Sequence, residues 1–439
     1  MPQQHEAAVV TAAATYFPSF TRTTGRRTVT ACNGDEDAIT LAVSAGLRCA
    51  PAAAGRIEQL FVVLGHSPLR SGPVAEIIRE ALCLPAEVAC TTVLDDDLGA
   101  MNVLLNAIDQ VTLGRSGPVL VVAAEGGDGH SVGASAVALL VTGAPVNGGI
   151  AITESRSEGA VVYGSWSGDN GASGRADPRF LDASLTGPVR RLLDFLDARA
   201  AGLGALAVSG GLPAEVRGDL PAQLPTTEVG DCGVTGPLLA LLAGARLAAN
   251  RPFLCLSTSP ARSSLIRASV TGNADWLPET TAPETVPRAP EQAAAPALSL
   301  PPSSPFFARS ARELLRLEAG KCDACGHIAF PPAQRPICAA CGGSSWNAYQ
   351  MSRVGAVYTF TVNRFLPAGF GDQLVMILGE MTDGTRYWAP ASGITGDDVS
   401  IGLPVELHLR RYTQTSGIPA YAMKFTPPLR PAAASETNR

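Results

Sequence analysis

The stretch KCDACGHIAFPPAQRPICAACG, residues 321–342, contains two CxxCG motifs with twelve residues between the second and third cysteines. Each motif places two thiolates on a tight knuckle, and the glycine after it lets the backbone turn so that amides face sulfur. Two such knuckles complete a closed tetrahedral shell of four sulfur atoms. The sequence therefore predicts a structural zinc site, with His327 left as a surface residue, and its ligands are Cys322, Cys325, Cys338 and Cys341.

The residues around this motif predict a small β-rich region. SARELLRLEAG at 310–320 has the pattern of a helix that leads into the cysteines, and strands are expected at 355–365, 373–381 and 405–411. Upstream, residues 276–304 are rich in Pro, Ala and Ser and poor in bulky apolar side chains, so they cannot bury enough surface to fold. They are predicted to form a linker.

The C-terminal region resembles an acyl-CoA-associated family that joins a rubredoxin-like zinc ribbon to an OB-fold barrel. The resemblance rests on RELLRLEAGKCDACGHIAFPPAQRPICAACG, GAVYTFTVNRFLP and VSIGLPVEL, and it covers residues 305–428. It implies a helix plus zinc ribbon at 305–350, an OB-fold domain at 351–430 and a disordered tail at 431–439. Members of this family sit beside thiolase-superfamily proteins or are fused to them, hold complexes together and can help to bind CoA.

The larger N-terminal region predicts an α/β architecture. Helix-like and strand-like segments alternate from residue 38 to 142, and a second, shorter series follows, so two βα halves are visible. The strand-like runs, such as RIEQLFVVLG and GPVLVVAAE, are continuously apolar, as in strands that are covered on both faces. These patterns predict a buried sheet built from two similar halves.

Composition excludes several classes of function. The net charge is −6 and no basic block is present, so nucleic acid is not an expected partner. No apolar run reaches the roughly 18 residues that a membrane span needs, and the start MPQQHEAAVV lacks the pattern of a secretory signal. A cytoplasmic protein without a membrane partner is therefore expected, and the six cysteines outside the CxxC motifs are predicted to be small buried hydrophobic residues rather than disulfides.

The N-terminal region also resembles 3-hydroxy-3-methylglutaryl-CoA synthase and 3-oxoacyl carrier-protein synthase III, both of the thiolase superfamily. The supporting segments are GDEDAITLAVSAGLRCA, RIEQLFVVLGHSP, DDDLGAMNVLLNAI and GDCGVTGPLLALLAGARLA, in that order along the chain. The resemblance implies a duplicated α-β-α-β-α layered domain over residues 1–275. It also implies a CoA or phosphopantetheine thioester as ligand, carried by acyl-CoA or acyl carrier protein.

Enzymes of that superfamily use a Cys nucleophile at a helix N-terminus, a His, and an Asn or second His. The motif positions in this chain fall on other residues. The nucleophile position falls on Asp97, or on Asp96 if the register slips by one, and Cys90 lies too far upstream to replace it. The two later positions fall on Gly210 or Gly211 and on Gly230 or Asp231. All three catalytic identities are therefore predicted to be lost.

Two functional hypotheses follow from this loss. In the first, the chain is a binding and assembly subunit that works as a homodimer or with an intact thiolase or ketosynthase, and Asp97 is a helix cap. In the second, it is an acyltransferase, decarboxylase or retro-aldolase in which Asp97, Asp231, His66 or His130 transfers protons. For both histidines, the interpretation as ordinary loop residues is favoured over a chemical role.

Overall fold

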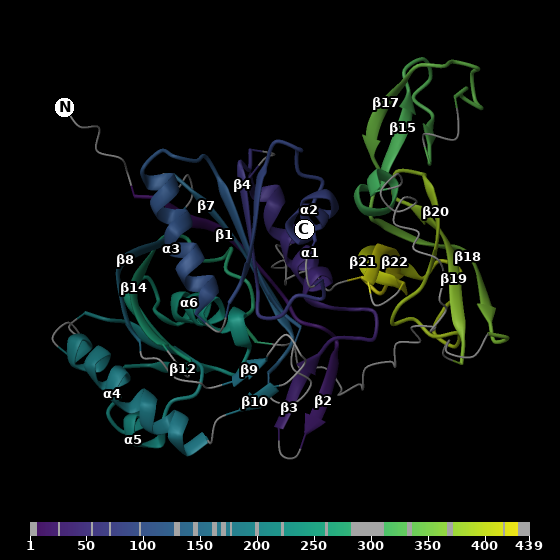
Figure 1. Cartoon of the computed structure of the whole chain (residues 1–439). Helices are drawn as coiled ribbons and strands as arrows, with labels where there is room; N and C mark the ends of the chain where they lie inside the picture. Colours follow the sequence, from purple (N-terminus) through teal and green to yellow (C-terminus); the bar gives the residue numbers. More distant parts are fainter. Residues whose placement is uncertain are drawn as a thin grey trace, which may run out of the picture. The chain divides into compact units, whose positions relative to one another are not determined.

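The computed structural model of the chain divides into two compact units (Figure 1). The sheet unit comprises Met1–Ala31, Ala45–Ser67 and Ala86–Ala289, and the barrel unit comprises Cys32–Ser44, Pro68–Pro85 and Pro290–Arg439. The predicted domain boundaries at 275, 304, 350 and 430 stay predictions. The structure describes residues 7–24, 27–53, 56–69, 72–95, 98–126, 132–143, 148–159, 165–167, 173–175, 178–197, 202–220, 224–259, 262–281, 311–331, 336–366, 372–415 and 418–428.

A ten-stranded mixed sheet forms the centre of the sheet unit, in the order β12-β11-β13-β14-β8-β1-β7-β6-β4-β5. Its strands are β1 Val9–Tyr16, β4 Gln59–Leu64, β5 Ala89–Leu94, β6 Val119–Glu125, β7 Ser135–Thr142, β8 Gly148–Gly159, β11 Ala205–Ser209, β12 Thr226–Val229, β13 Phe253–Thr258 and β14 Arg262–Gly272. If the strands of each half are renumbered in chain order, the two halves have the same spatial order when each is read from its edge of the sheet toward the centre. In each half, three parallel strands are followed by an antiparallel one, so the predicted duplication is confirmed.

Helices cover both faces of this sheet because its strands are apolar on both faces. On β11, Ala205 and Ala207 pack in one core cluster with helix α6, Gly236–Leu247, whereas Leu206 and Val208 pack in a second cluster with helix α4, Pro178–Asp197. Alternate side chains on a strand point to opposite faces, so α6 and α4 cover opposite faces of the sheet.

Helix α6 is buried around its circumference, as its apolar sequence GPLLALLAGARL requires. It shares its core cluster with helix α3, Gly99–Thr112. A Cβ at Gly244 would lie 2.6 Å from the Phe253 ring, so this glycine is what lets α6 pack so closely against β13. The remaining described elements of the unit are β2 Phe20–Thr24, β3 Arg27–Ala31, the 3₁₀ turns η1 Ala50–Ala53 and η2 Gly233–Thr235, β9 Ser165–Ser167, β10 Ser173–Arg175 and α5 Ala214–Arg217.

The barrel unit contains a three-stranded sheet, β16-β15-β17, and a five-stranded sheet, β20-β19-β18-β21-β22. A bridge between Ala391 and Phe425 joins the end of β20 to β22, so the second sheet is a nearly closed barrel. The assignment of this barrel as an OB-fold stays a prediction. The strands are β15 Glu318–Cys322, β16 Ile328–Ala329, β17 Trp346–Gln350, β18 Val354–Asn363, β19 Leu374–Met381, β20 Arg386–Pro390, β21 Pro404–Thr415 and β22 Ile418–Thr426.

The segment expected to form a helix at 310–320 differs from that expectation. Only the π-helical turn η3, Arg312–Arg316, forms, and Leu317 then adopts a left-handed conformation with φ 55° before β15 begins. Strand β15 extends to Cys322 because its partner β17 supplies a hydrogen-bonded edge. A tertiary pairing has therefore overridden the helical pattern.

Two segments from early in the chain complete the barrel unit. They are residues 32–44, which include the first part of helix α1, Ala38–Cys49, and residues 68–85, which include helix α2, Val74–Ala81. Within the described residues, no helix is both long enough and apolar enough to cross a membrane.

Candidate functional site

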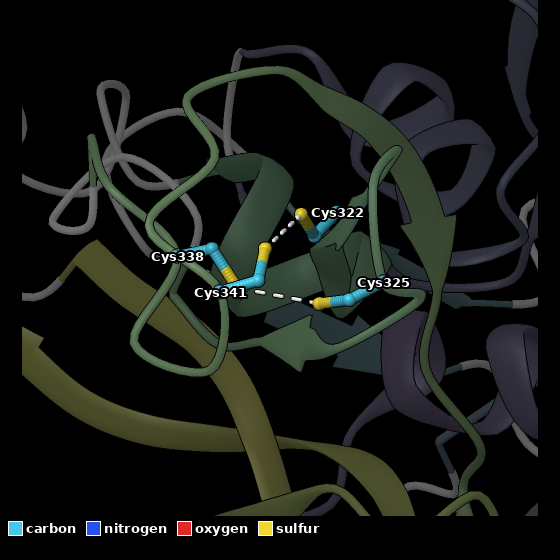
Figure 2. A group of neighbouring side chains, drawn as sticks. All are labelled: Cys322, Cys325, Cys338 and Cys341. Atoms are coloured by element: carbon cyan, nitrogen blue, oxygen red, sulfur yellow. Dashed lines mark hydrogen bonds between the residues drawn. The ribbon is translucent and has the colours of Figure 1, made fainter.

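Four cysteines converge at one end of the three-stranded sheet, as Figure 2 shows. All four Sγ atoms lie within 4.8 Å of one another, with 3.6 Å between Cys322 and Cys341 and 3.7 Å between Cys325 and Cys338. These separations are far longer than a disulfide bond. A tetrahedral zinc ion with bonds of about 2.3 Å would hold its sulfur ligands about 3.8 Å apart. The four residues therefore fit a tetrahedral metal ion with a closed sulfur shell.

The two knuckles have matching backbone geometry. Gly326 and Gly342 have φ values of 73° and 76°, which glycine adopts without strain. Their amides donate to the carbonyls of Cys322 and Cys338 over 2.8 and 2.9 Å. This places each pair of cysteines on one turn before any metal binds. His327 is half-buried and lies outside the cluster, so the sulfur atoms need no fifth ligand.

The residues proposed for catalysis do not come together as one visible site. Asp97, its alternative Asp96, and His130 lie outside the described residues. His66 is exposed just after β4, and Asp231 is exposed just before η2. Their roles stay predictions.

One of the two positions expected for the catalytic His, Gly210, is closed by the backbone. Gly210 follows β11 with φ 82°, and a Cβ added there would lie 2.0 Å from the carbonyl oxygen of Thr258. Such a contact is impossible for any side chain without moving the main chain of β13. Gly211 has open space around it, and so has Gly230 at the third position, which is exposed. A His side chain therefore does not fit at Gly210 with this backbone, and the assignment of the catalytic position to Gly210 or Gly211 stays a prediction.

A buried carboxylate that the sequence analysis missed lies near these positions. Glu125 ends strand β6, and its Oε2 atom lies 2.1 Å from where a Cβ of Gly65 would be and 2.4 Å from where a Cβ of Gly233 would be. The two glycines thus make room for the Glu125 side chain. The only signal in the sequence is a single acid at the end of the apolar run VLVVAAE.

Cys232 also belongs to this region. Burial together with the Asp231 and Glu125 carboxylates raises the pKa of its thiol to about 12, against a hydrogen bond with Ser135 that lowers it. Because the thiolate is the nucleophilic form of cysteine, Cys232 is unreactive at neutral pH. The Ser135 and Thr235 hydroxyls are hydrogen-bonded to each other over 2.6 Å. The region has polar groups but no activated nucleophile among the described residues.

None of the six cysteines outside the CxxC motifs forms a disulfide. Cys49 and Cys255 are buried and Cys32, Cys83, Cys90 and Cys232 are half-buried, so the expectation of small buried residues holds best for the first two. Burial raises the pKa of Cys49 to about 12.

Known proteins resemble this chain both in sequence and in fold. No family model matches the chain. A DUF35 domain-containing scaffold protein from Pyrococcus furiosus is 32% identical over 123 residues, which are 27% of this chain and 88% of that protein. A probable enoyl-CoA hydratase alpha subunit from Thermomonospora curvata is 36% identical over 93 residues, which are 21% of this chain and 28% of that protein. The chain thus spans well under two thirds of the second relative.

Solved structures with a similar fold are thiolase-like proteins. PksG, a HMG-CoA synthase from Bacillus subtilis, has a TM-score of 0.51 at 17% identity, covering 62% of this chain and 81% of its own. Xanthomonas campestris OleA, solved with lauric acid and lauroyl-CoA, has a TM-score of 0.51 at 15% identity and covers 60% and 99%. The HMG synthase of the curacin pathway, solved with holo donor acyl carrier protein, has a TM-score of 0.50 at 15% identity and covers 62% and 82%.

At such low identity the likeness concerns the fold alone, and the fold agrees with the duplicated strand order of the ten-stranded sheet. The predicted thiolase-like architecture is thereby confirmed. The match to the Pyrococcus furiosus protein, which covers most of that protein's length, assigns the family. The chain belongs to the family of DUF35 domain-containing proteins and carries, in addition, a thiolase-like α/β fold.

Proposed function

We propose that the chain is an acyl-thioester-binding assembly subunit that supports an active thiolase or ketosynthase, and that it has no acyl-transfer activity of its own. The observation that carries this proposal is the backbone at Gly210, where the Thr258 carbonyl excludes any side chain. The unreactive Cys232 thiol agrees with it. Proteins that share a fold do not share an activity when one of them lacks the reacting groups.

Similar proteins support the classes of ligand and partner in this proposal. OleA and the curacin-pathway HMG synthase were solved with lauroyl-CoA and with acyl carrier protein, and the Pyrococcus furiosus relative is named a scaffold protein. We infer a CoA or phosphopantetheine thioester as ligand and an intact thiolase-fold enzyme as partner. We also infer that zinc is the metal of the four-cysteine site, because a closed sulfur shell is typical of structural zinc. A cytoplasmic location stays a prediction.

Thioester binding without turnover is the first expected result. With acetyl-CoA at about 100 times its dissociation constant, binding to the folded state alone would stabilise the protein by about 2.7 kcal/mol. Thermal unfolding with and without acetyl-CoA measures this effect. Chromatography of the same mixtures should show free CoA released no faster than without protein, and mass spectrometry should show no acyl adduct.

The alternative, an enzyme with altered chemistry, is favoured by one observation, the buried Glu125 carboxylate between Gly65 and Gly233. Enclosed carboxylates can act as bases. Turnover of the thioester that is lost in Glu125→Gln or Asp97→Ala, while the variant stays folded, would reject the binding-subunit proposal. Equal and negligible turnover in all three proteins supports it.

We further propose that the sheet unit dimerises through β5, and this gives a second expected result. Among the residues that the structure describes, strand β5 pairs only with β4, and Leu94 on it is 58% exposed, although the neighbouring strands are buried. An edge strand of this kind is a template for pairing with another chain. Leu94→Lys should convert a dimer into a monomer in sedimentation, whereas Leu113→Lys, at a leucine 55% exposed after α3, should not. A wild-type monomer would contradict the proposal.

A further inference from the structure

The two cysteine knuckles have equivalent backbones but differ at one position. In the first knuckle the Cys322 amide donates to the His327 carbonyl over 2.8 Å, and in the second the Cys338 amide donates to the Gly343 carbonyl over 2.7 Å. His327 and Gly343 each stand two residues after the second cysteine of their motif, so they occupy matching positions. The first knuckle therefore carries a histidine side chain at a position where the second carries none.

The position without a side chain lies directly beside two sulfur atoms. A Cβ added to Gly343 would lie 3.4 Å from Cys341 Sγ and 3.5 Å from Cys322 Sγ, which are ordinary van der Waals distances. The φ of Gly343 lies outside the left-handed region, so the backbone does not require glycine here. Because residue 343 is a glycine, the second knuckle offers no side chain at this position to cover the two sulfur atoms.

These two sulfur atoms belong to one exposed and one buried cysteine. Cys341 is exposed, whereas Cys322 is 2% exposed, and their Sγ atoms, joined by a dashed line in Figure 2, lie 3.6 Å apart. Metal-bound thiols are deprotonated, and the oxidation of a cysteine increases with its thiolate character and exposure. Cys325 is exposed too, but His327 stands at the covering position of its knuckle. An oxidant therefore reaches Cys341 first, and Cys322 is the neighbour that can react with the oxidised sulfur.

We propose that Cys341 and Cys322 form a redox switch, in which hydrogen peroxide oxidises the pair to a disulfide and the metal is released. The Cys341 thiolate attacks the peroxide, so that an S–O bond forms, the O–O bond breaks, and the departing hydroxide takes a proton to become water. The Cys322 thiolate then attacks the Cys341 sulfur, so that the S–S bond forms, the S–O bond breaks, and a second hydroxide leaves and is protonated. The two sulfur atoms are oxidised, and the peroxide is reduced to water.

Oxidation of this pair acts on the three-stranded sheet. Cys322 is the last residue of β15 and pairs with Trp346 of β17, so the disulfide forms at the end of this strand pair. Loss of these two ligands opens the closed sulfur shell that holds the metal. The switch rests on the zinc site proposed above. Zinc content tests that site, and disulfide mapping tests the switch, so the two can fail separately.

Zinc release from the purified full chain tests the switch. In excess hydrogen peroxide the wild type should release about one zinc per chain to a chromogenic chelator. Mass spectrometry of the half-oxidised protein should find the disulfide between Cys322 and Cys341. Gly343→Ala should release zinc about fivefold more slowly, because a methyl group then covers both sulfur atoms. Gly218→Ala is the matched control and should release zinc at the wild-type rate, since Gly218 has φ −71° and no atom within 4 Å of an added Cβ.

A first disulfide between Cys325 and Cys338, or between the two cysteines of one motif, would overturn the proposal. Zinc release from Gly343→Ala at the wild-type rate would overturn it too, as would retention of zinc by wild-type protein under peroxide that oxidises free cysteine. If Gly343→Ala contains no zinc when purified, the disulfide map of the half-oxidised wild type decides alone. Dithiothreitol with added zinc should restore the bound metal, and irreversible loss would mean that the oxidation is damage rather than a switch.

Discussion

Replacing Cys322 by Ser is expected to remove the bound metal and unfold the three-stranded sheet. Cys322 is buried, and its Sγ atom lies 3.6 Å from that of Cys341. Its loss removes one of the four sulfur ligands, on the buried side of the site. Zinc binding in zinc-finger peptides contributes about 10 to 16 kcal/mol of folding free energy. We expect about one zinc per chain in the wild type and none in the variant, by elemental analysis, with a large drop in the unfolding temperature of the barrel unit.

Cys90→Ser is the matched control for this experiment. Cys90 is a half-buried thiol outside the CxxC motifs, and its Sγ donates to the Val88 carbonyl, a bond that a serine hydroxyl can replace. The control should retain its zinc. If Cys322→Ser retained a full equivalent of metal, the four-cysteine site would not be the site of binding. If the purified wild type contained iron, the proposal that the metal is zinc would be wrong, although the four cysteines would still be the metal site.

Removing the charge of Arg410 is expected to cause the second large effect. Arg410→Leu leaves the Glu36 carboxylate, which is 3% exposed, without its cationic partner. Breaking a buried ion pair from one side costs about 3 to 5 kcal/mol. Chemical denaturation of the variant should show a loss of that size in the free energy of unfolding.

An exposed ion pair in the same barrel provides the comparison. Arg386 and Glu380 are 3.1 Å apart, and their side chains are 49% and 47% exposed. Exposed pairs contribute about 0 to 1 kcal/mol, so Arg386→Leu should change stability by no more than that. A similar small loss in Arg410→Leu would mean that water reaches Glu36 readily and that the pair is not a stabilising contact.

The four-cysteine site could be predicted from the sequence because its geometry is local. Each CxxCG motif fixes two ligands and one turn within five residues, and only the meeting of two motifs depends on the rest of the chain. Two βα halves were predictable for a similar reason, since runs such as VLVVAAE identify buried strands, and the resemblance to the thiolase superfamily implied their duplication, whereas the order of the strands in the sheet was not predicted. The absence of a His at Gly210 was also visible in the sequence.

What could not be predicted depends on distant contacts. Glu125 looked like the polar end of a strand, and only the structure places it between Gly65 and Gly233, from two other segments. The acidic residues Asp35 to Asp37 looked like part of a thiolase-type helix start, and their basic partners lie near the end of the chain. When complementary charges lie this far apart in the sequence, neither segment alone shows a pattern that predicts their pairing.

Helix α1 begins among residues of the barrel unit and ends among residues of the sheet unit. This shared helix limits how such a gene can evolve. A recombination event that joined a foreign C-terminal part near residue 290 would bring in new β21 and β22 strands while keeping the old Asp35, Glu36 and Asp37. Asp35 and Glu36 would then lose their cations and Asp37 the Tyr421 hydroxyl at once, so lineages with this architecture should inherit both ends of the chain together.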